Sequence, residues 1–139
     1  MMKKLVLVTS LLFLMGSFTV NASLSIVVNK ANDAEIDEKT VQRIFLGKEK
    51  KFSNGNEAVP INLTTNNAGR SVFDEQVLGR SSSQVSAYWS KLVFTGKGVP
   101  PTDAANDEAV LVAIEADVNA IGYVDSASVT DAVKVIMTK

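Results

Sequence analysis

The residues INLTTNNAGRSVFDEQVLG, numbers 61 to 79, carry the clearest indication of fold in this chain. They predict a short strand, then a polar loop over Thr64–Ala68, then an amphipathic helix that opens at Gly69. A helix N-terminus has unpaired backbone N–H groups and a partial positive charge, so such a loop can hold an anion. Arg70 lies in the first turn, where the helix dipole disfavours a cation by about 0.3–1 kcal/mol. A bound oxyanion would offset this cost, and so would an ion pair with Asp74 one helical turn away.

Strands and helices alternate on both sides of this stretch. Polar N-caps precede three further amphipathic segments, at Asp37, Ser81 and Asn106. The remaining predicted elements are strands over 24–28, 58–63, 120–124 and 133–137, a loop over 95–102, and a short turn or helix near residue 125. This alternation predicts an α/β fold with a mixed or parallel sheet.

The first 22 residues predict a secretory signal peptide. Lys3 and Lys4 are followed by the apolar run Leu5–Val20, and Val20-Asn21-Ala22 supplies small residues where a signal peptidase cuts. We therefore expect a periplasmic or secreted protein of residues 23–139, a single domain of 117 residues without membrane insertion after cleavage. An uncleaved N-terminal anchor is the alternative.

Composition excludes several classes of function. The sequence contains no Cys and no His, which excludes disulfides, Ser-His-Asp triads and zinc or copper sites built on those ligands. Without Lys3 and Lys4, twelve basic residues face fifteen acidic ones, so a nucleic-acid partner is not expected. No pair of carboxylates stands out as catalytic. We expect a non-enzymatic protein with no cofactor and no metal.

Three segments resemble a known family: Ile44–Lys48, Ala87–Gly98 and Ala120–Val124. They are similar to small exported phosphate-binding proteins, which are related to the substrate-binding components of ABC transporters. The resemblance covers nearly all of residues 23–139. It implies a three-layer domain with a mixed sheet, equivalent to one lobe of a type II periplasmic binding protein.

The resemblance also implies a ligand site. The larger phosphate-binding proteins hold phosphate on a Gly-Ser-Gly-Thr loop at a helix N-terminus, often followed by Arg and, three residues later, Phe. Aligning Arg70 and Phe73 with that pattern puts Asn67, Ala68 and Gly69 at the Ser, Gly and Thr positions. The implied ligand-binding residues are Thr65, Asn66, Asn67, Ala68, Gly69, Arg70 and Ser71.

The size of the chain limits what such a site can do. A single lobe holds an anion in an open, wet site, so we expect weak binding of phosphate or a similar oxyanion, at about −4 kcal/mol for millimolar affinity. Two chains facing each other, as a homodimer, could close the cleft, and a link to ABC-type phosphate uptake is implied. The alternative function is an interaction or signalling accessory of the cell envelope that has lost its ligand and binds a protein partner.

Overall fold

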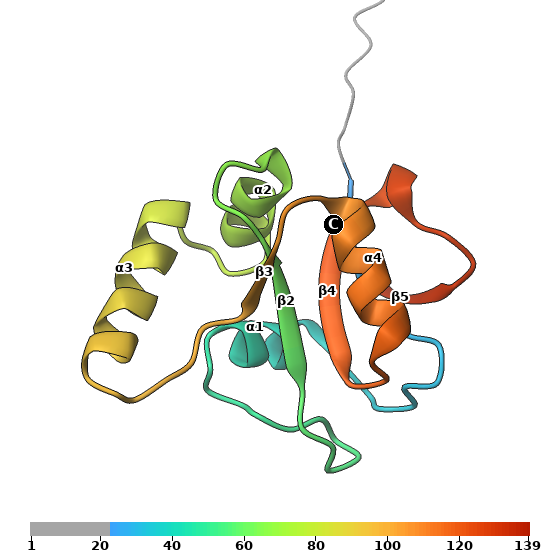
Figure 1. Cartoon of the computed structure of the whole chain (residues 1–139), viewed down its shortest axis with the longest axis horizontal. Coiled ribbons are helices and arrows are strands. Elements are labelled where there is room, and N and C mark those ends of the chain that lie inside the picture. The colour runs from blue at the N-terminus through green and yellow to red at the C-terminus, as the bar shows by residue number, and fades with distance from the viewer. Residues whose placement is uncertain (1–22) are drawn as a thin grey trace, which may run out of the picture.

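The computed structural model describes residues 23–139 (Figure 1). The predicted signal peptide and its cleavage site, residues 1–22, lie outside the described residues. The elements are β1 Leu24–Asn29, α1 Glu38–Phe45, β2 Val59–Leu63, α2 Ala68–Gln76, α3 Ser82–Phe94, β3 Thr102–Ala104, α4 Asp107–Ala116, β4 Ala120–Asp125, the 3₁₀ turn η1 Ser126–Ser128 and β5 Val133–Thr138. None of the helices in this part of the chain is long and apolar enough to cross a membrane.

The five strands form one mixed sheet in the order β3-β2-β4-β1-β5. Strand β2 runs parallel to β3 and to β4, whereas β1 is antiparallel to both of its neighbours, β4 and β5. Reciprocal hydrogen bonds between Leu24 and Lys139 bring the start of β1 and the end of β5 together. The predicted α/β fold with a mixed sheet is therefore confirmed.

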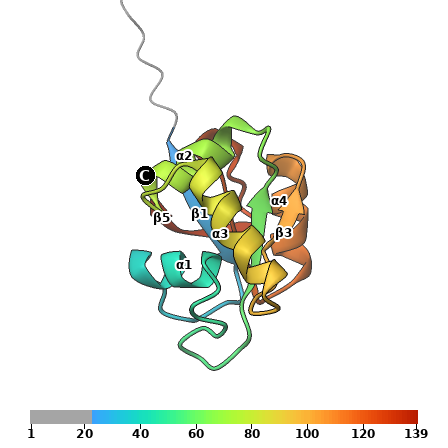
Figure 2. The same cartoon turned by 90° about the vertical axis from the view of Figure 1, so that its left-hand side faces the viewer.

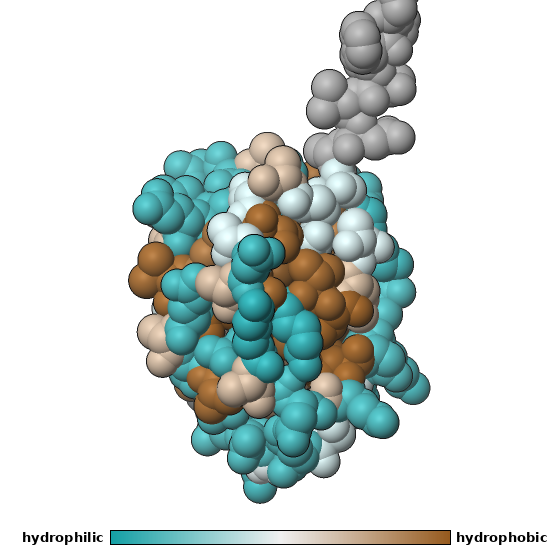
Figure 3. Space-filling view, turned by 90° about the vertical axis from the view of Figure 1, so that its right-hand side faces the viewer, coloured by the Kyte–Doolittle hydropathy of each residue, from teal (hydrophilic) through white to brown (hydrophobic). Residues whose placement is uncertain are grey.

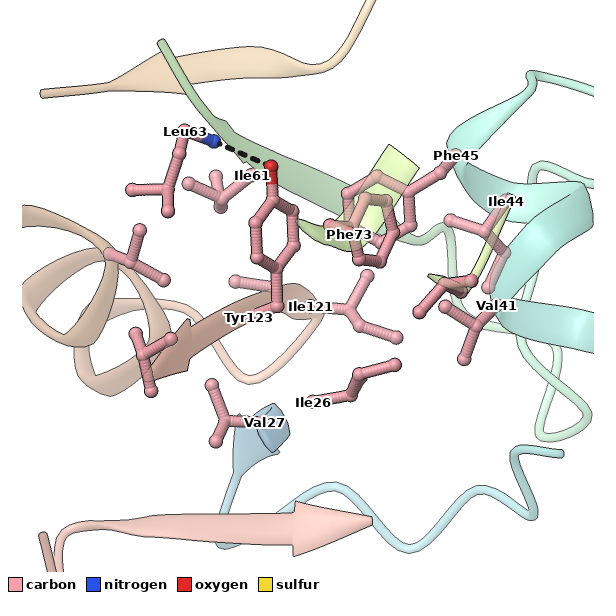
Figure 4. Packing of buried hydrophobic residues seen from close by; sticks show 14 of the residues in the cluster. Ile26, Val27, Val41, Ile44, Phe45, Ile61, Leu63, Phe73, Ile121 and Tyr123 are labelled. Atoms are coloured by element: carbon pink, nitrogen blue, oxygen red, sulfur yellow. Dashed lines mark hydrogen bonds between the residues drawn. The ribbon is translucent and has the colours of Figure 1, made fainter. Parts of the chain in front are cut away.

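Helices cover both faces of the sheet, as the central strand β4 illustrates. A Cβ on Gly122 would lie 2.8 Å from Val110 of α4, so this residue faces α4 on one side. The next residue, Tyr123, faces the other side, where its ring stacks on Phe73 of α2 at 3.9 Å and lies 6.0 Å from Phe45 of α1 (Figure 4). Successive side chains of a strand point to opposite faces. The result is the expected three-layer arrangement.

The N-caps form as the sequence predicts. Asp37, Ser81 and Asn106 each accept a backbone N–H of the first turn, and Ser81 forms a capping box with Gln84. Since these caps satisfy local donors with a side chain three residues away, they can be read from sequence.

Two predicted boundaries need correction. Helix α2 begins at Ala68 and not at Gly69, because Asn67 supplies the cap and places the first helical turn one residue earlier. The segment predicted as loop over 95–102 ends in β3, whose first residue is Thr102. This three-residue strand exists because it pairs with β2, a long-range contact with no local signal.

Candidate functional site

A surface pocket of about 500 Å³ lies at the N-terminus of α2. The N-terminus of α4, the start of β1 and the end of β4 complete its wall. The lining residues are Ser23, Leu24, Asn67, Ala68, Gly69, Val72, Asn106, Asp107, Glu108 and Asp125. Three of the seven residues predicted as ligand-binding, Asn67 to Gly69, therefore line one pocket.

The cap of α2 uses two of the backbone donors at this helix end. Asn67 Oδ1 accepts the Gly69 N–H at 2.9 Å, and the Asn67 carbonyl accepts the Arg70 N–H at 3.0 Å. Within residues 23–139, the Ala68 N–H has no protein acceptor. The amide of Ala68 is thus a free donor at the positive end of a helix, beside the pocket.

Gly69 has a packing role at this position. A Cβ there would lie 2.9 Å from Leu63 Cδ1 and 3.2 Å from Asn67 Oδ1. The missing side chain allows the first turn of α2 to approach the end of β2 while Asn67 keeps its capping geometry. The space that glycine leaves here is therefore occupied by Leu63 and Asn67 of the protein itself.

Arg70 points into the protein and does not line the pocket. Its Nε donates to Asp74 Oδ2 at 2.9 Å, and its Nη1 donates to the Leu63 carbonyl at 2.9 Å. Ser82 donates a second bond to Asp74 Oδ2 at 2.8 Å. Of the two explanations that the sequence left open for Arg70, the ion pair with Asp74 is the one observed. Its charge is compensated inside the fold.

The other predicted residues lie on the outside of the same turn. Thr65, Asn66 and Ser71 are exposed, and the hydroxyl of Thr64 donates to Asn66 Oδ1 at 2.6 Å. Their polar groups are available to solvent, but none of the three lines the pocket.

Carboxylates on the opposite wall were not predicted from the sequence. Asp107 and Glu108, in the first turn of α4, and Asp125, at the end of β4, line the pocket. Asp107 Oδ2 accepts the Asp125 N–H and the Ser128 hydroxyl, at 3.1 and 2.7 Å, so this carboxylate is held in place. The cap at Asn106 indicated a second helix N-terminus, but only the sheet order brings it opposite α2. These negative charges oppose a bound anion.

A buried polar group supports the loop from below. The Tyr123 hydroxyl accepts the Leu63 N–H at 3.2 Å and donates to Asn62 Oδ1. Because the ring is buried, the pKa of Tyr123 is raised well above its ordinary value, so the hydroxyl keeps its proton. Tyr123 and Arg70 together fix the end of β2, from which the polar loop departs.

No protein-family model matches the sequence, and no curated protein matches it. Solved structures do match over most of the chain. An ABC-type phosphate transport receptor from Vibrio cholerae is 18% identical, with a TM-score of 0.64 over 84% of this chain and 46% of its own length. A phosphate ABC transporter substrate-binding protein from Clostridium perfringens, solved with bound phosphate, is 16% identical, with a TM-score of 0.65 over 83% of this chain and 45% of that one.

PstS from Borrelia burgdorferi gives a TM-score of 0.61 at 11% identity, over 82% of this chain and 47% of its own. The chain therefore spans less than half the length of the structures that it matches. At these identities the likeness concerns the fold. The chain has the fold of a single lobe of the phosphate ABC transporter substrate-binding proteins.

Proposed function

We propose that this protein is an exported, non-enzymatic solute-binding-like domain that binds phosphate or a related oxyanion weakly at the N-terminus of α2. The observation that carries the proposal is the free Ala68 amide, which lies at a positive helix end beside a pocket. The fold, shared with a protein solved with bound phosphate, supports it. The proposal includes a functional link to ABC-type phosphate uptake.

The geometry predicts low affinity. A charge-assisted hydrogen bond contributes about 1.5–3 kcal/mol, so the Ala68 N–H with one further donor of the loop reaches roughly the −4 kcal/mol of millimolar binding. Asp107, Glu108 and Asp125 line the same pocket and reduce the attraction. Arg70 contributes little directly, since Asp74 compensates its charge.

The sharpest test removes the free Ala68 donor without removing the helix. Proline is favoured at the first helical position, where its missing N–H would be unpaired in any case. Asn67 already has the extended backbone that a following proline requires, with φ −88° and ψ 130°. Ala68→Pro should therefore leave α2 folded and weaken phosphate binding at least about fivefold, which corresponds to roughly 1 kcal/mol.

Glu38→Pro is the matched control, because Glu38 is the first residue of α1 and follows Asp37, which is also extended, at φ −96° and ψ 174°. Titration with phosphate and sulfate, followed by calorimetry and by amide NMR shifts, measures both variants. Shifts centred on residues 65–71 that Ala68→Pro removes and Glu38→Pro retains support the proposal. No shifts at millimolar anion, or equal losses in both variants, would reject it.

The buried ion pair of Arg70 favours a second function, that of an envelope interaction accessory. The guanidinium of Arg70 is compensated by Asp74, and three carboxylates line the pocket. Both features suit a domain that binds a protein partner and does not bind an anion. In that case a purified envelope partner binds stoichiometrically, and Ala68→Pro does not change its affinity. Competition of the partner by phosphate would argue for the first function instead.

A further inference from the structure

We propose that the end of α3 and the loop after it form a peripheral contact site for the surface of an anionic phospholipid bilayer. The two most exposed large apolar side chains of the described residues are Phe94, at 92%, and Val99, at 89%. Val93, next to Phe94, is 52% exposed. We name these three residues the apolar tip.

Local contacts hold the end of α3 and the loop after it together. The chain reverses at Gly96, whose φ is 69°, and the Lys97 N–H returns to the Leu92 carbonyl at 2.8 Å. Gly98 lies against Leu92 and Trp89, where a Cβ would approach their side chains to 3.4 and 3.1 Å. The loop is thus packed back on α3, and the protein covers neither Phe94 nor Val99.

Net charge is positive in the segment that carries the apolar tip and in one that meets it at a groove, in a protein that is otherwise acidic. Residues 48–57 and 80–97 both contribute to this groove, with Glu49, Lys50, Glu57 and Lys97 among its lining residues, and we name the two segments together the basic pole. The basic pole has two carboxylates, Glu49 and Glu57, and six cations: Lys48, Lys50, Lys51, Arg80, Lys91 and Lys97. The rest of residues 23–139 has six cations against thirteen carboxylates. Figure 2 shows α3 at the front of this side of the molecule, with the segment between α1 and β2 below it.

Exposed apolar side chains flanked by lysines suit the interface of an anionic membrane. The apolar groups enter the boundary between headgroups and acyl chains, while each cation near the surface adds electrostatic attraction. Between Gln76 and Thr102 the chain carries no carboxylate that would be repelled by lipid phosphates. The chemistry therefore favours a lipid surface as the occupant.

The opposite face also exposes apolar side chains, and these provide matched controls (Figure 3). Val112 of α4 is 60% exposed and Val135 of the edge strand β5 is 40% exposed. Lys30 and Lys39 are exposed cations outside the basic pole. Substitutions at these positions change hydrophobicity and charge by similar amounts elsewhere on the surface.

The test is sedimentation with vesicles of phosphatidylglycerol and phosphatidylethanolamine, compared with vesicles of phosphatidylcholine. We expect the exported protein to bind the anionic vesicles reversibly and to lose binding as salt is raised. Phe94→Ser should weaken partitioning about tenfold, as the transfer of one apolar side chain predicts, and Lys91→Glu with Lys97→Glu should weaken it at least about thirtyfold, because two attractive charges are reversed. Val112→Ser and the pair Lys30→Glu with Lys39→Glu should bind as the unchanged protein does.

Three outcomes would overturn the proposal. One is equal binding to both kinds of vesicle, or to neither. Another is an equal loss of vesicle binding in the variants of the apolar tip and in their controls. The third is self-association at low salt that Phe94→Ser abolishes while vesicle binding is absent, which would assign the apolar tip to contact between copies of this chain. Any contribution of residues 1–22 is common to all variants, so the differences between them report the apolar tip.

Discussion

At the level of single residues, we expect the largest loss of stability when the buried ion pair of Arg70 and Asp74 is broken. Both side chains are almost fully buried, and Asp74 Oδ1 has no hydrogen-bond partner among the described residues. Arg70→Ala would leave the carboxylate without its compensating charge, which typically costs about 3–5 kcal/mol. Urea denaturation should therefore show a large loss of stability in this variant.

A double variant checks the cause. Arg70→Met with Asp74→Leu removes both charges, so it should recover most of the stability that Arg70→Ala loses. If Arg70→Ala instead proves nearly neutral, and high phosphate stabilises the unchanged protein but not the variant, the guanidinium serves a ligand and the structural explanation fails.

Tyr123 gives a prediction that depends on pH. Burial raises its pKa above the ordinary value near 10, so above about pH 10 the unfolded chain releases a proton that the folded protein keeps. The free energy of unfolding should then fall by about 1.4 kcal/mol per pH unit relative to Tyr123→Phe. Near neutral pH the variant should be about 1–3 kcal/mol less stable, since Leu63 N–H and Asn62 lose a partner.

Urea titrations of both proteins between about pH 8 and 11 measure this difference. The curves should converge as pH rises. Parallel curves over the whole range would mean that Tyr123 is accessible to water, or that the hydroxyl ionises in the folded state at its ordinary pKa.

At the level of secondary-structure elements, two glycines that end helices separate backbone strain from packing. Gly47 follows α1 with φ 69°, and Gly79 follows α2 with φ 66°. A Cβ at Gly47 would lie 2.7 Å from Trp89 Cη2, whereas nothing lies within 4 Å of one at Gly79. Both alanine variants should lose roughly 1–2 kcal/mol of stability because of the left-handed backbone. Gly47→Ala should lose about 1–3 kcal/mol more, because its Cβ overpacks against Trp89.

Thermal denaturation compares the two variants, and the fluorescence of Trp89, the one tryptophan of the chain, reports the packing directly. Only Gly47→Ala should shift the emission. Equal losses of stability with unchanged emission would show that the turn after α1 moves away from Trp89 without cost.

The elements also show which features a sequence can predict. Caps and helix ends such as Asp37, Gly79 and Ser81 involve partners within a few residues, and the structure agrees with them. Strand β3 and the carboxylates opposite Ala68 depend on the order of strands in the sheet, which no local pattern encodes.

Arg70 illustrates the same limit at the candidate site. The sequence marked it as a cation in an unfavourable field, but the choice between ligand and Asp74 depends on the direction of one buried side chain. The residues implied by the family resemblance lie in the loop before α2 and in its first turn, and both their role in binding and the ligand stay predictions.

At the level of the whole molecule, stability should be uneven. Strands β1 and β4 are almost fully buried, with Ile26, Val27, Ile121 and Tyr123 inaccessible to solvent. Helix α3 lies to one side of the sheet, as Figure 1 shows, and buries only Val85 and Trp89. Local opening should therefore be easier in α3 than in the central strands.

Native-state hydrogen exchange measures this directly. Amides of α3 should exchange with an opening free energy at least about 1.4 kcal/mol below that of β1 and β4, a tenfold difference in protection. Anionic vesicles should raise the protection of the last turn of α3 if the apolar tip contacts lipid. Uniform protection would mean that the molecule opens only as a whole.

The pairing of Leu24 with Lys139 has a consequence for how such a unit can be reused. Because Leu24 and Lys139 pair at the same end of two adjacent strands, the described residues could be inserted into a surface loop of another polypeptide with very short joints on either side. Paired ends of this kind make insertion into another protein tolerable. Inserting residues 23–139 into a permissive loop of a host protein would show whether the domain keeps its structure there.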